Sequence, residues 1–157
     1  MKKRAVTAGK AALMAALMSC VMLIGAALTN GAASASVLIT NDVGGEVSSY
    51  VQKFQQMRAA GDRVVIDGPC LSACTLLTGI IPRDRVCVTS RAELGFHAAS
   101  YYDDASRSFI PTREGSEEVM RYYPSAVRAW IGRHGGLTPK LKMMRGPELT
   151  ALYRTCE

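Results

Sequence analysis

The chain has 157 residues, of which 48% are hydrophobic and 20% charged, and its formal net charge is +6. Four of the 19 basic residues lie in the first 35 positions, which hold none of the 13 acidic residues, so the remainder carries only +2. A charge this small gives no basis for nucleic-acid binding, and we expect no nucleic-acid partner. The roughly 120 residues after position 35 suit one compact domain.

Residues 1–35 have the features of a secretory signal peptide. A basic start is followed by the uncharged, mostly apolar run Ala11–Leu28, and Ala33–Ala35 offers small residues for cleavage before Ser36. We therefore expect an exported, periplasmic protein. The apolar run is also long enough for an uncleaved anchor in the inner membrane, with possible membrane association of the N-terminus, and Cys20 leaves lipidation open.

Four cysteines follow the leader: Cys70, Cys74, Cys87 and Cys156. An even number in an exported chain predicts two disulfides, and four cysteines allow three pairings. Bridges at Cys70 and Cys74 would brace the turn between them, and we expect one bridge to tie Cys156 back to the core. Zinc is less favoured because only two histidines are present, so we expect no metal and no cofactor.

Strand and helix patterns alternate through the first half of the mature chain. The predicted elements are a strand at Val37–Thr40, a helix at Glu46–Ala60, a strand at Val64–Ile66, a helix from Ser72 to about Thr78, and a strand at Val86–Thr89. This order predicts an α/β fold in which crossover helices join the strands of a parallel sheet. The Gly44–Gly45 turn and Ser72 follow strand ends, where ligands bind in such sheets.

The second half of the chain predicts a mainly helical part. A polar stretch at residues 100–109 is expected to be a loop or flap, after which Ser116 is a candidate cap for a helix. A further helix should follow Pro124 and end at Gly135–Gly136. Short helices are then expected from Thr138–Pro139 and at Glu148–Tyr153.

Three motifs occur in an order that resembles a known superfamily. They are the strand with a glycine pair at residues 39–45, the turn Cys70–Leu71–Ser72–Ala73–Cys74, and the strand that ends in Leu94–Gly95–Phe96–His97. Together they resemble the Clp-protease/crotonase superfamily, and in particular small exported relatives of the Clp proteolytic subunit and of signal peptide peptidase. The resemblance spans about residues 37–98, and it implies one Clp-protease-like α/β domain over residues 36–157.

The resemblance also implies a catalytic site. Ser72 would be the nucleophile, and neutral His97 would take its proton, because a serine hydroxyl reacts poorly until a base lies within hydrogen-bond reach. The backbone N–H groups of Gly45 and Ala73 would stabilise the oxyanion of the intermediate. The substrate would be a peptide or a small acyl compound.

The third residue of such a triad is missing from its place. Alignment with the last helix of the family puts Leu141 where an aspartate would stand. Asp103, Asp104 or Glu148 could orient His97 instead, and Lys140 or Lys142 could serve as the base in a Ser–Lys arrangement. The long segment through which the Clp subunit builds rings is also absent, so we do not expect ring assembly.

Three hypotheses about function follow. The first is a Clp-like serine hydrolase, which could be a peptidase. The second is a catalytically inactive member of the fold that binds peptides or a protein in the periplasm. The third is a structural protein of the cell envelope. Simpler roles compete with catalysis at each position, because Ser72 could be only a helix cap and His97 only a hydrogen-bonded buried histidine.

Overall fold

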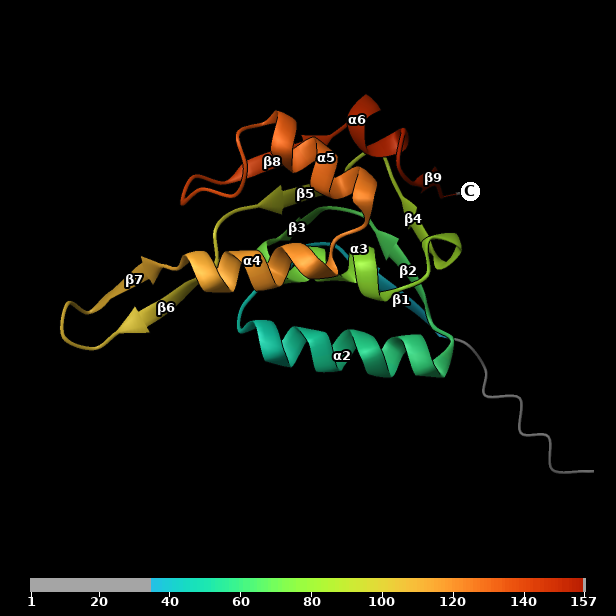
Figure 1. Cartoon of the computed structure of the whole chain (residues 1–157). Helices are drawn as coiled ribbons and strands as arrows, with labels where there is room; N and C mark the ends of the chain where they lie inside the picture. The colour runs from blue at the N-terminus through green and yellow to red at the C-terminus, as the bar shows by residue number, and fades with distance from the viewer. Residues whose placement is uncertain (1–34, 157) are drawn as a thin grey trace, which may run out of the picture. The chain divides into compact units, whose positions relative to one another are not determined.

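The structure, a computed structural model, describes residues 35–156 (Figure 1). The predicted leader lies outside these residues, apart from Ala35. So does Ala11–Leu28, the alternative membrane anchor. Within the described residues no helix is both long enough and apolar enough to cross a membrane.

A four-stranded parallel sheet draws three strands from the first half of the described chain and one from its end. Its strands are, in spatial order, β1 (Ser36–Ile39), β2 (Arg63–Ile66), β4 (Val86–Val88) and β9 (Arg154–Thr155). The predicted α/β fold with a parallel sheet is therefore confirmed, and the first three strands lie within a residue or two of their predicted positions. The edge strand β9, from the end of the described chain, was not predicted.

Helix α2 (Val47–Ala60) joins β1 to β2, as predicted. The chain enters it at Glu46, whose carboxylate accepts hydrogen bonds from the Ser48 and Ser49 hydroxyls. It ends at Gly61, which has a φ of 81° and closes the helix through bonds from its N–H to carbonyls of the last turn. Burial of Phe54 and Met57 packs the helix against the core.

A second sheet of three strands lies beside the first. It contains β3 (Pro69–Leu71), β5 (Glu93–Phe96) and β8 (Lys142–Arg145), with β3 and β5 parallel and β8 antiparallel to β5. The helix predicted from Thr138–Pro139 is wrong. The Thr138 carbonyl accepts the Ala98 N–H at 2.8 Å, and the chain then bends and enters β8, which pairs with the edge of β5.

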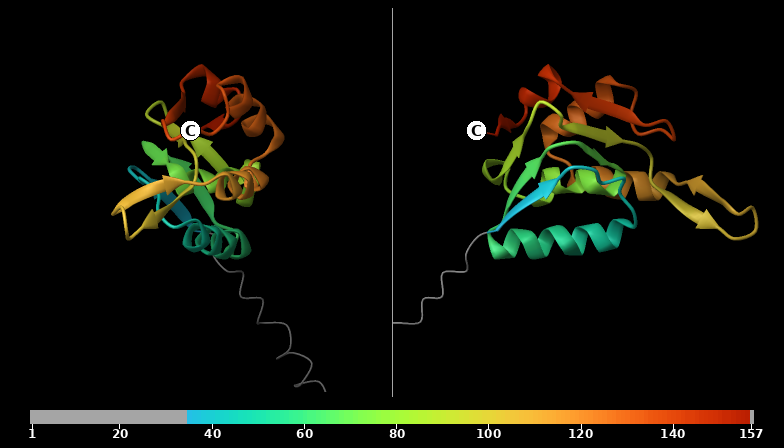
Figure 2. Two further views of the ribbon diagram at one scale, coloured as in Figure 1. Left: turned by 60° about the vertical axis from the view of Figure 1, so that its left-hand side comes forward. Right: turned by 180° about the vertical axis from the view of Figure 1, so that it is seen from behind.

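Two further predictions from the same region are corrected. Of the loop or flap expected at residues 100–109, the loop is wrong, because β6 (Ser100–Asp103) and β7 (Ser108–Pro111) form an antiparallel hairpin. This hairpin projects from the body of the domain, as a flap would (Figures 1 and 2). Helix α4 (Arg113–Tyr122) is capped by Thr112, whose side chain accepts the Gly115 N–H at 2.8 Å. Ser116 is therefore not the cap.

Helix α4 lies between α2 and the two C-terminal helices, which lie at the end of the domain away from α2 (Figures 1 and 2). Helix α5 (Ser125–Arg133) buries the three apolar residues Val127, Trp130 and Ile131. Helix α6 (Pro147–Thr150) is shorter than predicted. The C-terminal part is therefore helical, as expected, but the strands β8 and β9 interrupt it.

Two disulfides join the four cysteines in pairs, as predicted. Cys70 bonds to Cys74 across a Cα–Cα distance of 5.3 Å, and Cys87 bonds to Cys156 across 5.0 Å. The second bridge ties the end of the chain to strand β4 of the core, which was the expected role for one of them.

Candidate active site

Ser72 has an unusual backbone conformation. It follows strand β3 directly and opens a 3-10 helix, η1 (Ser72–Leu76), which continues into α3 (Leu77–Ile80). Its φ is +55°, in the left-handed region that few residues other than glycine adopt. Leu71 is the N-cap residue of this helix, so the Ser72 hydroxyl is not used as a cap. Within the described residues this hydroxyl has no hydrogen-bond partner.

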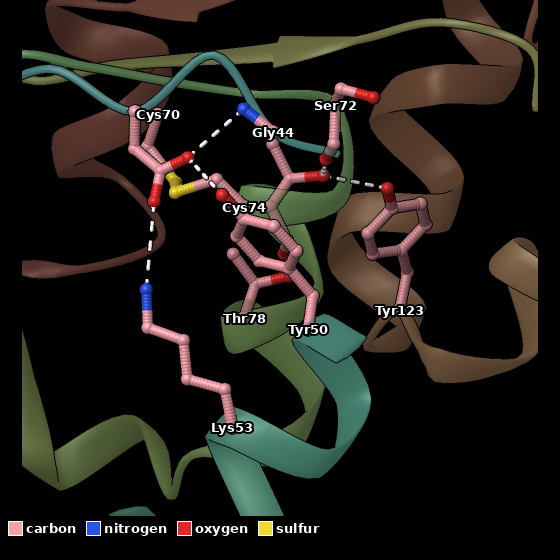
Figure 3. Close-up of a disulfide and its surroundings, with 10 residues drawn as sticks. Gly44, Tyr50, Lys53, Cys70, Ser72, Cys74, Thr78 and Tyr123 are labelled. Carbon is pink, nitrogen blue, oxygen red and sulfur yellow. Dashed lines mark hydrogen bonds and ion pairs between the residues drawn. A yellow bond between two sulfur atoms is a disulfide. The ribbon is translucent and has the colours of Figure 1, made fainter. Parts of the chain in front are cut away.

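Covalent and hydrogen bonds hold Ser72 in place. The Cys70–Cys74 disulfide spans it, and both cysteines are fully buried. The buried Thr75 hydroxyl donates to the Ser72 carbonyl at 2.6 Å and lies 2.7 Å from the Tyr123 hydroxyl, which therefore acts as the donor between the two (Figure 3). Burial raises the pKa of Tyr123 to about 12, so this donor keeps its proton.

Asp42 fixes the glycine turn beside Ser72. Its backbone forms an isolated parallel bridge with β3, donating to Pro69 and accepting from Leu71, both at 2.8 Å. One oxygen of its carboxylate accepts the Gly44 N–H at 2.9 Å and the Tyr50 hydroxyl at 2.5 Å. Burial, assisted by this bond, raises the pKa of Tyr50 to about 12.

Gly44 lies in direct contact with Ser72 (Figure 3). A Cβ atom at Gly44 would come within 2.6 Å of both the Ser72 Cβ and the Leu71 carbonyl oxygen, and φ at Gly44 is +82°. Only glycine fits such a position. The next residue, Gly45, has an N–H group with no acceptor in residues 35–156. The Ala73 N–H belongs to the first turn of η1, where backbone N–H groups have no partner within the helix.

His97 follows the last residue of β5 and is half-buried. Its Nδ1 atom lies 2.7 Å from the backbone carbonyl oxygen of Ala98. A carbonyl oxygen can only accept a hydrogen bond, so Nδ1 carries the proton in the neutral ring and Nε2 has a free lone pair.

Ser72, His97 and the Gly44–Gly45 turn line one cavity of about 1240 Å³. The structure therefore brings the predicted nucleophile, the predicted base and the predicted oxyanion turn to the same space, although no hydrogen bond joins Ser72 to His97 among the described residues. Walls of the cavity come from α2, α4 and the β6–β7 hairpin. A second cavity of about 570 Å³, beside Ala98 and Leu137, contains neither Ser72 nor His97.

Carboxylates considered for the third position have other partners. Asp103 accepts hydrogen bonds from the backbone and side chain of Ser106, and Glu148 accepts the Trp130 indole N–H at 2.9 Å. No carboxylate of the described residues, Asp104 included, forms an ion pair with His97.

The lysines considered as bases do not reach Ser72. The Lys142 ammonium donates to the His134 and Gly136 carbonyls, at 2.5 and 2.6 Å. Lys140 is exposed, and neither lysine hydrogen-bonds to Ser72 in the described part of the chain.

Leu141 lies near the end of the strand that carries His97. It precedes Lys142, which pairs with Phe96, and its side chain lies 3.1 Å from the position of a Cβ atom at Gly95. An apolar side chain thus stands beside the strand end where the resemblance expects an aspartate.

Sequence reasoning missed three supports of the site. Asp42 forms an Asx turn with the Gly44 N–H, and an aspartate two residues before a glycine could have predicted it. Tyr123 was not among the residues predicted for the site. The Ala98 carbonyl could not have been found, because a backbone acceptor leaves no mark in a sequence.

Comparisons with known proteins find little similarity in sequence. No protein-family model matches the chain, and no curated protein matches it. Among solved structures, the chain is similar to a mutant of ClpP1 from Listeria monocytogenes, with 13% sequence identity and a TM-score of 0.44 over 76% of this chain and 71% of that chain.

Proposed function

We propose that the protein is an exported serine hydrolase with a Clp-protease-like fold, in which Ser72 is the nucleophile and His97 the base. One observation carries the proposal. Ser72 stands in a left-handed conformation at a strand end, and it shares one cavity with His97 and the Gly44–Gly45 turn. Strain of this kind at a non-glycine residue is typical of functional sites.

The residues suit acyl transfer. His97 Nε2 takes the proton of the Ser72 hydroxyl as Oγ attacks the substrate carbonyl carbon, which becomes tetrahedral. The Gly45 and Ala73 N–H groups stabilise the oxyanion, and loss of one such donor typically costs about 10²–10³ in rate. The protonated Nε2 then gives its proton to the leaving group. Water hydrolyses the acyl-serine by the same steps, which restores the hydroxyl.

The walls of the cavity favour an apolar substrate. Among the described residues, six large hydrophobic side chains are exposed, and four of these line this cavity: Val43, Tyr101, Tyr102 and Phe109. Exposed apolar surface concentrated at one place marks a binding site. We therefore infer that the substrate is a peptide or a small acyl compound with an apolar chain.

Export is supported by two independent features. The leader has the pattern of a signal peptide, and both disulfides would persist only in an oxidising compartment such as the periplasm. Retention of Ala11–Leu28 as an inner-membrane anchor is the alternative, and the N-terminal sequence of the mature protein distinguishes the two.

Labelling with a fluorophosphonate tests the proposal. The wild type should be labelled at Ser72, Ser72→Ala should not be labelled, and His97→Ala should be labelled far more slowly because the hydroxyl loses its base. Near-UV circular dichroism shows that each variant remains folded. Labelling that persists in Ser72→Ala would contradict the proposed nucleophile.

A binding module without catalysis is the second candidate. It is favoured by the apolar cavity walls and by the absence of a hydrogen bond between Ser72 and His97 in the described residues. In that case the wild type would bind an apolar peptide, would lose the binding when Phe109 is changed to serine, and would react with fluorophosphonate no faster than Ser72→Ala.

A further inference from the structure

We propose that the backbone carbonyl of Ala98 takes the place of the missing carboxylate and positions His97 for catalysis. This inference rests on the proposed function, and it adds to it the group that orients the base. The carbonyl oxygen lies 2.7 Å from His97 Nδ1, whereas no described carboxylate pairs with the ring.

Hydrogen bonds on both sides hold the Ala98–Ala99 peptide still. The Ala98 N–H donates to the Thr138 carbonyl at 2.8 Å. The Ala99 N–H donates to the Ser116 hydroxyl at 3.0 Å, and the Ala99 carbonyl accepts the Thr112 N–H at 2.8 Å. Since Ala98 is also only 7% exposed, its carbonyl is a fixed acceptor.

The carbonyl supplies one of the two services that a carboxylate gives to a catalytic histidine. It selects the Nδ1–H tautomer, so that Nε2 presents its lone pair for the Ser72 proton. A neutral oxygen stabilises the charged ring of the transition state less than a carboxylate does. Leu141 can therefore occupy the place of the aspartate, and we expect a slow enzyme whose base is nevertheless in the right tautomer.

The tautomer can be measured without any assay of activity. The chain has two histidines, so the variant His134→Asn leaves His97 as the only imidazole. Long-range ¹H–¹⁵N spectra of histidine-labelled protein at about pH 8.5, above the ordinary histidine pKa of about 6.5, show which nitrogen is protonated. We expect the proton on Nδ1. A ring protonated mainly on Nε2, the tautomer that free histidine prefers, would overturn the inference.

A backbone substitution tests the contribution to the rate. Lactic acid incorporated at position 99 turns the Ala98–Ala99 amide into an ester, whose carbonyl is a weaker acceptor. It also removes the Ala99 N–H, so Ser116→Ala is the matched control, since it removes the acceptor of that N–H together with the hydroxyl that donates to the Thr112 carbonyl. We expect the ester to lower esterase activity about tenfold or more and to mix the tautomers of His97, while Ser116→Ala keeps most activity and the Nδ1–H tautomer.

The outcomes separate this inference from the proposed function. Equal losses of activity in the ester protein and in Ser116→Ala would overturn the role of the carbonyl. An active wild type with the Nε2–H tautomer would also overturn the role of the carbonyl, but it would leave the proposed function standing. A wild type with the Nδ1–H tautomer and no hydrolase activity would overturn the proposed function and the catalytic role of the carbonyl with it.

Discussion

At the scale of single residues, the site depends on Ser72, whose backbone is strained, and on the neighbouring Gly44, which no other residue can replace. A left-handed conformation costs a residue other than glycine roughly 1–2 kcal/mol. At Ser72 this cost is offset by the bonds around it, from the Cys70–Cys74 disulfide and from Thr75. Gly44 makes room for the turn because its missing side chain lets the backbone approach Ser72.

Gly44→Ala should therefore lower the free energy of unfolding by more than the strain of its positive φ alone. Gly136 is the matched control, because its φ of +73° resembles the +82° of Gly44, while a Cβ atom there would meet nothing within 4 Å. Both alanines cost the strain of a positive φ, about 1–2 kcal/mol. Gly44→Ala also collides with backbone, so we expect it to lower the free energy of unfolding by about 2 kcal/mol more than Gly136→Ala.

Urea unfolding of the two variants measures this difference. Gly44→Ala should also lose fluorophosphonate labelling, because the collision displaces Ser72. Equal stabilities for the two variants would show that the contact between Gly44 and Ser72 is looser than the structure has it.

Leu141→Asp should raise the rate of hydrolysis. A hydrogen bond to a charged group contributes about 1.5–3 kcal/mol and one between neutral groups about 0.5–1.5 kcal/mol, so a carboxylate beside His97 should lower the barrier by about 1.4 kcal/mol, or tenfold in rate. The gain should fall well short of the roughly 10⁴ lost when a triad loses its carboxylate, because much of that loss reflects a wrong tautomer.

Leu141→Asn, with the same shape and no charge, is the control. We expect kcat on an activated ester to rise in the aspartate variant and to stay near the wild-type value in the asparagine variant. A rise of several thousandfold in Leu141→Asp would mean that the wild-type ring lacks the correct tautomer, contrary to the role given to Ala98.

At the scale of elements, the two disulfides differ in how much they stabilise the fold and in whether the loop that they close contains Ser72. The Cys70–Cys74 bridge closes a short loop with a sequence separation of 4, and the Cys87–Cys156 bridge a long one of 69. Chain-entropy estimates give about 2 kcal/mol for the short loop and about 4 kcal/mol for the long one. Only the short loop contains Ser72.

Removal of the Cys87–Cys156 bridge should therefore mainly lower the free energy of unfolding, whereas removal of the Cys70–Cys74 bridge should mainly lower the reactivity of Ser72. Cys87→Ala/Cys156→Ala should lose about twice as much free energy of unfolding as Cys70→Ala/Cys74→Ala, and yet keep its labelling rate at temperatures where it is folded. The Cys70→Ala/Cys74→Ala variant should lose most of its labelling. Urea unfolding and labelling rates measure both quantities. A folded Cys70→Ala/Cys74→Ala protein that reacts like the wild type would show that the bridge does not hold Ser72 in place.

Elements were predictable where local pattern and tertiary structure agree. The apolar spacing in Val47–Ala60 and the β-branched runs at Val64 and Val86 gave elements that the structure confirms. Thr138–Pro139 looks like a helix start, but the free edge of β5 requires a partner strand, and this tertiary demand overrides the local signal. Ser116 failed as a cap for a similar reason, since its hydroxyl accepts the Ala99 N–H from a distant segment.

At the scale of the whole molecule, the core couples Ser72, the proposed nucleophile, to distant elements. Tyr123, which follows α4, reaches the Ser72 carbonyl through Thr75 and also packs edge-on against Phe96, the residue before His97. The order of Gly44–Gly45, Ser72 and His97 in the sequence predicted that they share a sheet edge. The contacts of Tyr123 with Thr75 and Phe96, which support Ser72 and the strand before His97, could not be predicted from the sequence, because they depend on how the two halves of the chain pack.

This buried tyrosine should make the fold sensitive to alkali. Burial raises the pKa of Tyr123 from 10.0 to about 12. Between these values the unfolded chain loses the proton and the folded chain keeps it, so the unfolded state binds fewer protons and stability falls as the pH rises. The contribution is fully present below about pH 10, and roughly 3 kcal/mol is lost as the pH rises through about 12.

Tyr123→Phe should weaken this dependence on pH. The variant should be less stable than the wild type at pH 8 by about 1 kcal/mol, because Thr75 loses a hydrogen bond, and its stability should fall less steeply above pH 10. Tyr50 and Tyr153, whose pKa values are also raised, account for the slope that remains. Urea unfolding from pH 8 to pH 11.5 gives both curves, and identical slopes would contradict the burial of Tyr123.

Direct detection of an acyl-enzyme tests the proposed role of Ser72 as the nucleophile. The wild-type protein is mixed with an activated p-nitrophenyl ester of an apolar acid, quenched with acid and examined by mass spectrometry, with Ser72→Ala alongside. We expect a burst of p-nitrophenol that matches the amount of enzyme, and an acyl group on the peptide that contains Ser72. The absence of both from a folded wild type, or an equal burst from Ser72→Ala, would contradict this role.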